Sequence, residues 1–317
     1  MTALSIGCTF SDRIEALLDG RVRIAGHEAV LRIVEPQRLF RAVLRDAAFD
    51  VAELSMASHI AAVAAGRRDY VGLPVFLSRS FRHGNLYIRT DRGIERPEDL
   101  AGRTIGLVDY QQTAALWLRG LLADDHGVAR ESIRWVTAGL HAPVLQDRAP
   151  MTLPAAIRVE RSSATLDTLL AEGKIDAVIS PGAPRCFLRQ TAPVSRLWPN
   201  PPAAALDYWR RTAVFPIMHL LVVRRSLIGA DPELAPALLA AFEDARMLAA
   251  ADLIGRDFPK LALPWLIDHA TATRDSLGGD PWTYSLEANR SVLETMLRYA
   301  EADGLSTGQV KICDLFA

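Results

Sequence analysis

The sequence has almost no lysine, no excess of charge of either sign and no long apolar run. These absences exclude several classes of function. The 36 Lys and Arg residues nearly balance the 37 Asp and Glu residues, so the formal net charge is -1 at pH 7. A chain without excess charge has no overall field that attracts nucleic acid or an anionic membrane. We therefore expect no nucleic acid partner, and any charged ligand must be recognised locally.

Cysteine is also scarce, with Cys8, Cys186 and Cys313 odd in number and without CxxC spacing. This pattern fits neither a disulfide framework nor a structural zinc site. The first residues, MTALSIGCTFSDR, show no basic segment leading into an apolar stretch, and no apolar run approaches the length of a membrane span. We expect a cytoplasmic protein that is not associated with a membrane.

Several catalytic motifs are missing as well. The sequence contains no HExxH metal motif, no GxSxG nucleophile elbow, no Walker phosphate loop and no GxGxxG after a strand. We expect no cofactor and no local metal site, which leaves open a divalent metal held by distant residues. Any catalysis is expected to be acid–base rather than covalent.

The pattern of apolar residues predicts an α/β fold. Short β-rich runs at residues 4–8, 29–34 and 49–54 are each followed by a helical segment, and such alternation is typical of parallel βαβ units. With 317 residues and 50% hydrophobic content, the chain is long enough for two lobes with separate cores.

The lobes are predicted to be nested in the sequence. Residues 91–203, with strands expected at 104–108, 133–136, 156–159 and 176–179 and a Pro-containing loop at 142–154, form the second lobe. Residues 1–90 and 204–317, including a strand at 212–224 and C-terminal helices, form a discontinuous first lobe. In such two-lobed folds, ligands bind at the strand ends that face the interlobe cleft.

Three strand-to-helix junctions are candidates for ligand binding, at residues 9–13, 53–58 and 109–113. Each offers free backbone N–H groups and the positive end of a helix dipole, which suit a carboxylate or a phosphate. Ordinary helix capping by Thr9, Ser55 or Asp109 is the simpler interpretation of any one junction alone.

Polar residues also interrupt two apolar runs. The run YVGLPVFLSRSFRHGNLY at residues 70–87 ends in Arg79, Arg82 and His83, and His219 lies inside FPIMHLLVV. Burying such a group without a partner costs about 1–3 kcal/mol, so each must find one. The basic residues either line an anion site or mark where the chain returns to water. For His219, a core imidazole bonded to backbone is the simpler interpretation.

Five segments of the chain are recognisable together: FDVAELSMASHI, LPVFLSRSFRHGNLYIR, GIERPEDLAGRTIGLVDYQQTAALWLRGLL, RTAVFPIMHLLVVRR and DPWTYSLEANRSVLETMLRYA. They resemble the 4,5-dihydroxyphthalate decarboxylase family, and the RH, YQxTA and FPIMH elements carry the resemblance. It implies a fold like that of type 2 periplasmic binding proteins. It also implies an enzyme that removes CO2 from a dihydroxylated aromatic dicarboxylate, and the chemistry of this reaction needs no electron-sink cofactor. The lack of an export signal favours an intracellular enzyme over a transport receptor.

Under this resemblance we assign candidate roles. The proton donor is His83 or His219, because imidazole titrates near working pH, and Glu53 accepts a hydrogen bond from a ring hydroxyl or orients a histidine. The expected substrate-binding residues are Arg82, Tyr110, Gln111, Gln112 and Thr113 for the carboxylates, Arg79 as a weaker cation, and Ser55 and Ser58 for further hydrogen bonds.

Two other functions remain open. Enzymes of menaquinone and thiamine synthesis are also similar to binding proteins and use other substrates on the same scaffold. A binding protein that captures an aromatic carboxylate without reaction is the alternative outside enzymes. The sequence identifies no dimer surface, so it predicts no oligomeric state.

Overall fold

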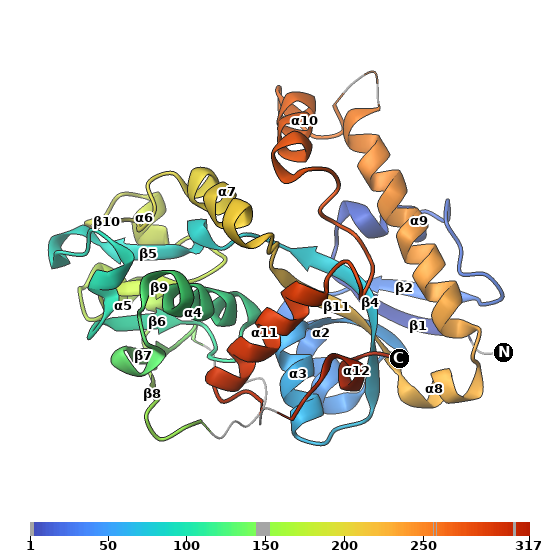
Figure 1. Ribbon diagram of the computed structural model, residues 1–317, viewed down its shortest axis with the longest axis horizontal. Coiled ribbons are helices and arrows are strands. Elements are labelled where there is room, and N and C mark those ends of the chain that lie inside the picture. Colours follow the sequence, from blue (N-terminus) through green and yellow to red (C-terminus); the bar gives the residue numbers. More distant parts are fainter. Residues whose placement is uncertain (1–2, 144–152, 256, 258, 307–308) are drawn as a thin grey trace. The chain divides into compact units, whose positions relative to one another are not determined.

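The computed structural model describes residues 3–317 except 144–152, 256, 258, 307 and 308, so most of the loop predicted at 142–154 lies outside the described residues. The chain divides into two compact units, coloured along the sequence in Figure 1. Unit 1 contains Met1–Arg79, Ile217–Leu293 and Lys311–Ala317, and unit 2 contains Ser80–Pro216 and Glu294–Val310. Each unit is described by itself.

Unit 1 is built on a five-stranded mixed sheet with the order β2-β1-β3-β11-β4. The strands are β1 (Leu4–Cys8), β2 (Ala29–Ile33), β3 (Val51–Ser55), β4 (Tyr70–Arg79) and β11 (Ile217–Arg224). β1 runs parallel to β2 and β3, whereas β11 is antiparallel to β3 and β4. The carboxyl ends of β1, β3 and β4 therefore meet the start of β11 at one edge of the sheet.

Helices cover this sheet on two sides. The long helix α9 (Leu234–Ile254) packs Leu238 and Phe242 onto a core that includes Ile6 and Cys8 of β1. Gly7 faces the other way, where a Cβ would lie 2.8 Å from Leu39 of α2. The helices of unit 1 are α1 (Glu15–Leu18), α2 (Pro36–Arg41), α3 (Met56–Ala64), α8 (Arg225–Ala230), α9, α10 (Leu266–Leu277) and α12 (Ile312–Leu315).

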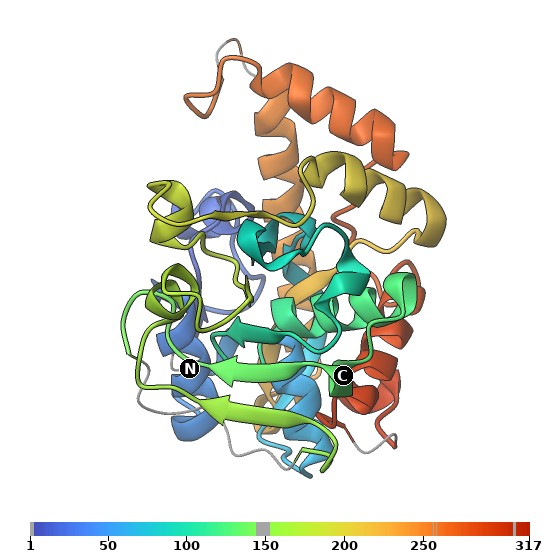
Figure 2. The same cartoon turned by 90° about the vertical axis from the view of Figure 1, so that its left-hand side faces the viewer.

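Unit 2 contains a six-stranded mixed sheet with the order β10-β5-β9-β6-β7-β8. Its parallel strands are seen side by side in Figure 2. The strands are β5 (Leu86–Arg89), β6 (Thr104–Leu107), β7 (Arg134–Thr137), β8 (Arg158–Arg161), β9 (Ala177–Ile179) and β10 (Val194–Arg196). The helices are α4 (Thr113–His126), α5 (Leu166–Ala171), α6 (Arg185–Leu188), α7 (Pro201–Thr212) and the greater part of α11 (Arg290–Ala302).

Short turns complete the two units. A π turn covers Ala42–Asp46, and 3-10 turns cover Asp12–Ile14, His83–Asn85, Thr90–Arg92, Pro97–Leu100 and Arg130–Ser132. The predicted strands before residue 200 are confirmed within two residues at either end. The strand predicted from 212 begins only at Ile217, because α7 continues to Thr212 and ends at Ala213 in the left-handed conformation.

The unit boundaries differ from the predicted lobes, which changed at residues 90 and 203. β5 pairs with β9 and β10 in the second sheet, and unit 2 begins at Ser80. Residues 294–310 also belong to unit 2, where the Tyr299 ring lies 5.6 Å from the ring of Trp117. Gly120 makes this packing possible, since a Cβ there would meet the Tyr299 ring at 2.1 Å.

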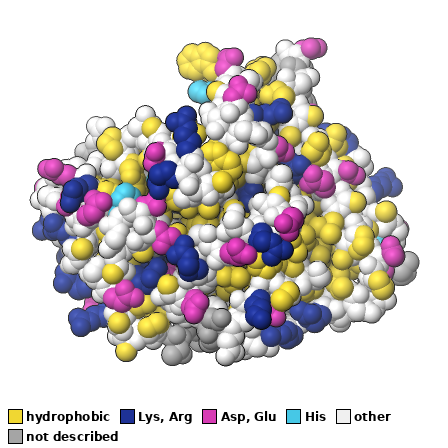
Figure 3. Space-filling view, in the orientation of Figure 1, with side chains coloured by type: hydrophobic (Ala, Val, Ile, Leu, Met, Phe, Trp, Pro, Cys, Tyr) yellow, Lys and Arg dark blue, Asp and Glu magenta, His cyan; other side chains and the backbone are white. Residues whose placement is uncertain are grey.

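Exposed apolar side chains gather on the α9–α10 segment, where Leu261, Trp265 and Ile267 are exposed. On the face shown in Figure 3, basic and acidic side chains are interspersed. No helix among the described residues is both long enough and apolar enough to span a membrane.

A buried ion network holds the end of α11 in unit 2. Asp303 is fully buried, and its carboxylate accepts from Arg119 Nε at 2.7 Å and from Arg130 Nε at 2.6 Å. Arg119 also donates from Nη2 to the carbonyl oxygen of Tyr110 at 2.9 Å. Because a charge away from water needs a partner, the buried Arg119 requires this carboxylate, which also pairs with the partly buried Arg130.

We expect Asp303→Ala to lower the free energy of unfolding by about 3–5 kcal/mol, because Arg119 would keep a buried charge without its carboxylate. Urea denaturation followed by circular dichroism measures the change. Glu301→Ala, two residues earlier and exposed, is the matched control and should change the free energy by less than about 0.5 kcal/mol. Equal losses in the two variants would contradict the proposed importance of the ion network.

Candidate functional site

A carboxylate–histidine pair lies at the edge of the first sheet. Glu53 Oε1 of β3 lies 2.6 Å from His219 Nδ1 of β11. The two strands are neighbours, and their register pairs His219 with Ser55, two residues after Glu53. Since side chains two residues apart share a face of a strand, this register brings the pair together.

Thr9 holds the second oxygen of the same carboxylate. Glu53 Oε2 accepts from the Thr9 backbone N–H at 2.8 Å and from the Thr9 hydroxyl at 2.6 Å. Glu53 is 2% exposed, and this burial favours a raised pKa, but the hydrogen bonds from His219 and Thr9 outweigh it. The pKa of Glu53 therefore lies below its ordinary value, and the carboxylate is ionised at neutral pH.

The arrangement leaves one nitrogen of His219 for chemistry. Nδ1 is directed at the Glu53 carboxylate, whereas Nε2 has no hydrogen-bond partner among the residues that the structure describes. The ring packs edge-on against Phe40, with centroids 4.8 Å apart, and about a fifth of the side chain is exposed. A carboxylate that orients one imidazole nitrogen fixes the position and tautomer of the other. His219 is thus not bonded to backbone as the simpler interpretation of the sequence proposed.

Two serines predicted for the site lie at the end of β3 and in the first turn of α3. Ser55 occupies the N-cap position of α3, but its side chain makes no capping hydrogen bond. Ser58 is 2% exposed, and its hydroxyl has no partner within the described part of the chain. A buried hydroxyl without a partner is unfavourable unless a ligand or water supplies one. The nearby thiol of Cys8 is not a good nucleophile, since burial and the Glu53 charge raise its pKa well above the ordinary value.

Arg79 has a structural role in the described contacts of unit 1. Its guanidinium donates to the carbonyl oxygen of Pro281 and to the side-chain oxygen of Asn289. Burial lowers the pKa of Arg79 to about 10, so the group is still a cation at neutral pH. Its weaker assignment as a substrate-binding residue stays a prediction.

His83, the other candidate proton donor, lies in unit 2 in an aromatic environment. It is 3% exposed, and its ring centroid lies 5.1 Å from that of Trp198 and 5.6 Å from that of Tyr208. Burial lowers the pKa of His83 to about 4. The imidazole is therefore neutral at neutral pH, and Nδ1 has no partner among the described residues.

Arg82 precedes His83 and is a partly buried cation. Its Nη1 donates to the side-chain oxygen of Asn85 at 3.1 Å. Burial lowers its pKa to about 10, which still leaves the guanidinium charged at neutral pH. The structure thus puts Arg79 at the end of the first segment of unit 1, whereas Arg82 and His83 lie near the start of unit 2.

The predicted loop before α4 carries three consecutive side chains with unsatisfied polar atoms. Tyr110 Oη, Gln111 Oε1 and Gln112 Oε1 are buried and have no partner in the described part of the protein. Tyr110 is 1% exposed and Gln111 is 2% exposed. Gln112 occupies the N-cap position of α4 and makes no side-chain capping bond, and Thr113 begins the helix. Native proteins seldom bury such atoms unpaired, so this loop has the character of a ligand-binding segment.

Residues far apart in the sequence support this loop. The Arg119 guanidinium lies 3.9 Å from the Tyr110 ring centroid while it bonds the Tyr110 carbonyl and Asp303. Sequence reasoning missed Arg119 and Asp303, and it considered Thr9 as a cap or as part of a ligand-binding junction but not as a partner of Glu53. The one available signal was an arginine inside the apolar helix run TAALWLRGLL, which needs an acidic partner when buried.

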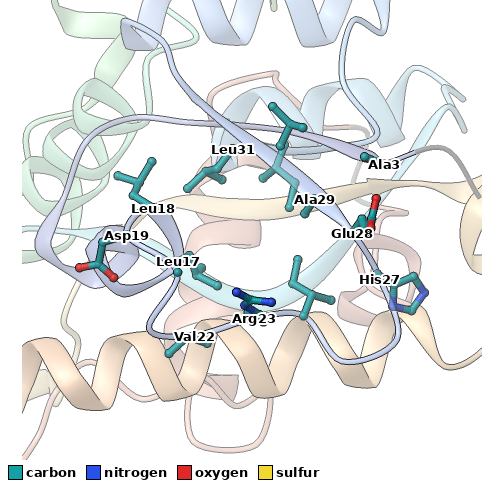
Figure 4. Close-up of a pocket in the computed structure, with 14 residues that line it drawn as sticks. Ala3, Leu17, Leu18, Asp19, Val22, Arg23, His27, Glu28, Ala29 and Leu31 are labelled. Atoms are coloured by element: carbon teal, nitrogen blue, oxygen red, sulfur yellow. The ribbon is translucent and has the colours of Figure 1, made fainter.

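A hollow of about 520 Å³ lies elsewhere on unit 1, beside β2. Figure 4 shows aliphatic side chains, among them Leu17 and Leu31, around it. His27 at its end has both ring nitrogens bonded, to Ala25 O and to Asp231 Oδ2, each at 2.8 Å. None of the predicted site residues lines this hollow, and we do not assign it to the chemistry.

The described residues contain no group of three or more His, Cys, Asp or Glu side chains placed to hold a metal ion. The expectation of a reaction without a metal or cofactor stays a prediction for experiment.

Comparison with known proteins identifies the family. The chain is 38% identical over 315 residues to a 4,5-dihydroxyphthalate decarboxylase of Comamonas testosteroni, which covers 99% of this chain and 96% of that protein. The chain belongs to the 4,5-dihydroxyphthalate decarboxylase family. A second member, from Pseudomonas putida, is 41% identical over 209 residues, or 65% of this chain and 81% of that one. The resemblance found in the sequence is confirmed.

Solved structures show which fold this decarboxylase family member adopts. Residues 55–190 match the family model described as NMT1/THI5 like. A putative periplasmic sulfonate-binding protein, SsuA of Methylobacillus flagellatus, superposes with a TM-score of 0.61 at 13% identity over 100% of this chain and 92% of that one. Protein AF1704 of Archaeoglobus fulgidus gives 0.55 at 16% identity over 96% and 98%. The predicted two-lobed periplasmic-binding-protein-like fold is confirmed, and the cleft stays a prediction.

We expect the His83 imidazole to titrate near pH 4, because burial penalises its charged form. His27 should titrate above its ordinary value, since it bonds Asp231 and the Ala25 carbonyl. Histidine proton–carbon NMR spectra across pH measure both, with His83→Gln to assign the signal. A His83 midpoint near the ordinary 6.5 would contradict this account.

The same shift affects stability. The unfolded chain takes up a proton at His83 near pH 6.5, whereas the folded chain does so only near pH 4. The contribution of His83 to the free energy of unfolding is therefore largest above about pH 6.5. It falls by a total on the order of 3 kcal/mol as the pH drops to about 4. Urea denaturation of the parent protein and His83→Gln should show a smaller pH dependence for the variant.

Proposed function

We propose that this protein is a carboxy-lyase that removes one carboxylate, as CO2, from 4,5-dihydroxyphthalate or a close dihydroxylated aromatic dicarboxylate. The Glu53–His219 pair carries the proposal, because it presents an oriented imidazole nitrogen at the strand edge in a chain of this family. A fold shared with binding proteins does not by itself imply catalysis. The oriented acid–base pair supports a reaction.

The chemistry requires a proton at the ring carbon that bears the carboxylate. With the para oxygen ionised, protonation of that carbon gives a cyclohexadienone. Cleavage of the bond to the carboxylate then releases CO2 and returns the electron pair to the ring and its para oxygen. One proton is consumed overall, and no electron acceptor is needed. A general acid beside the ring carbon is therefore the central requirement.

We assign the proton transfer to His219 Nε2. Glu53 holds Nδ1, so the ring is oriented and Nε2 can take a proton from solution and deliver it to carbon. His83 is the weaker candidate, because a pKa near 4 leaves it without the proton to donate at neutral pH. A neutral His83 can still hydrogen-bond to a substrate oxygen.

The proposed substrate contacts match the unsatisfied groups. The Gln111 and Gln112 side-chain oxygens are acceptors, which suit ring hydroxyls, whereas Arg82 and the start of α4 suit a carboxylate. Ser58 offers one further hydroxyl. A cytoplasmic setting is part of the proposal, since the cysteines are free thiols, as is usual in a reducing compartment.

We expect His219→Asn to lower kcat by about 10²–10⁴-fold with little change in KM, because the general acid is lost. Glu53→Gln should lower it by about 10–100-fold, since the imidazole loses its orienting carboxylate. The assay follows CO2 release and the ring product from 4,5-dihydroxyphthalate by chromatography, with and without chelator. His269→Asn, on the exposed face of α10, is the matched control.

The outcomes separate the alternatives. Turnover by His219→Asn equal to that of the parent protein would contradict the assignment. No turnover by the parent protein, together with tight binding of the diacid, would favour the non-catalytic binding protein. Loss of turnover only with chelator would show that a metal takes part.

We expect Gln111→Met to weaken binding of 4,5-dihydroxyphthalate by about tenfold, because an acceptor worth about 1 kcal/mol is removed. Binding of phthalate, which has no ring hydroxyls, should not change. Calorimetric titration measures both dissociation constants. Gln37→Met, at an exposed position of α2, controls for the change of residue type. Equal weakening for both ligands would contradict the role of Gln111 at the hydroxyls.

A further inference from the structure

A C-terminal segment of unit 1, around Tyr284, is fixed against the end of β4. The Arg79 guanidinium donates to the Pro281 carbonyl and to the Asn289 side-chain oxygen. Asn289 in turn donates to the carbonyl oxygens of Thr283 at 3.0 Å and Ser285 at 2.7 Å. The residues on both sides of Tyr284 are therefore held by one buried hydrogen-bond network.

A second contact fixes the same segment at the end of β1. The Arg13 guanidinium lies 4.1 Å from the ring centroid of Trp282, and its Nε donates to the Leu77 carbonyl of β4 at 3.0 Å. The edge to which Arg13 and Arg79 attach this segment also carries His219, whose register partner on β4 is Ser78. Tyr284 thus belongs to the strand edge that presents the Glu53–His219 pair.

The hydroxyl of Tyr284 is buried and has no partner among the residues that the structure describes. Its ring packs against the core cluster that contains Cys8 and Leu77. A buried phenol normally finds an acceptor, so an unpaired one at a reactive edge indicates a missing ligand. Burial raises the pKa of Tyr284, Arg13 and Arg246 oppose this, and the Glu53 charge adds to it. The net rise keeps the phenol protonated, as a hydrogen-bond donor must be.

We propose that Tyr284 Oη donates a hydrogen bond to the para ring oxygen of the substrate, a role that rests on the proposed decarboxylation. When the bond to the carboxylate breaks, its electron pair moves through the ring onto that oxygen. In the cyclohexadienone this oxygen carries no charge, and negative charge returns to it only as CO2 leaves. A fixed neutral donor stabilises that returning charge, and it needs no proton of its own to be transferred. Tyr284 is in this way a catalytic residue that acts on the opposite side of the ring from His219.

The test compares two Tyr→Phe variants of the same unit. Tyr284→Phe should lower kcat for 4,5-dihydroxyphthalate by about 10²-fold, as loss of one oxyanion donor does. Tm should not fall, because the Tyr284 hydroxyl bonds no residue that the structure describes. Tyr70 is the matched control: its hydroxyl donates to the Phe49 carbonyl at 2.5 Å. Tyr70→Phe should therefore lower Tm and leave kcat unchanged.

Two results would overturn the proposal: a kcat for Tyr284→Phe within about threefold of the parent value, or a fall in Tm matching that of Tyr70→Phe. If the parent protein does not turn over the diacid, the proposed function fails and calorimetry decides the role of Tyr284. Tyr284→Phe must then weaken binding of 4,5-dihydroxyphthalate but not of phthalate. Equal affinities in the parent and the variant would overturn the proposal.

Discussion

The candidate site depends on one buried carboxylate. Glu53 is 2% exposed, and its two oxygens are satisfied by different elements, Oε1 by His219 of β11 and Oε2 by Thr9 after β1. A carboxylate in this position is tolerated only when both oxygens have donors, so it fixes the distance between the ends of three strands. The same requirement orients the imidazole. Stability of the sheet edge and the geometry of the site thus depend on the same hydrogen bonds.

Unit 2 also depends on a buried charge that is compensated by residues from distant segments. There Asp303 compensates the buried Arg119 and the partly buried Arg130, and Arg119 also contacts the carbonyl and the ring of Tyr110. The loop at residues 110–113 keeps buried side-chain oxygens without partners among the described residues. Buried polar atoms without partners are costly, so their concentration in one loop is best explained by a ligand that completes them.

The sequence alone was sufficient for the α/β fold, the family and the positions of most strands, although β10 was not predicted and β11 begins five residues later than expected. These follow from local features, namely the alternation of β-rich and helical runs and short contiguous segments such as FPIMH. It was also sufficient to single out Glu53, His219 and the loop at 110–113, because polar residues beside buried strands stand out against an apolar background. The unit boundaries were less predictable, since β5 is assigned by pairing with β9 and β10, and pairing is not a local property.

Only the tertiary structure decided how these residues are used. The antiparallel register of β11 on β3 turned His219 toward Glu53, and a shift of one residue would have turned it to the other face. Burial near Trp198 and Tyr208 lowers the pKa of His83, so its imidazole is neutral at neutral pH. Its position directly after Arg82 in the sequence gave no sign of this. Thr9 and Arg119 make their contacts with residues far away in the chain, and the role proposed for Tyr284 depends on such contacts as well. Residue types and strand order are local information, whereas pairing, burial and charge compensation arise when distant segments meet.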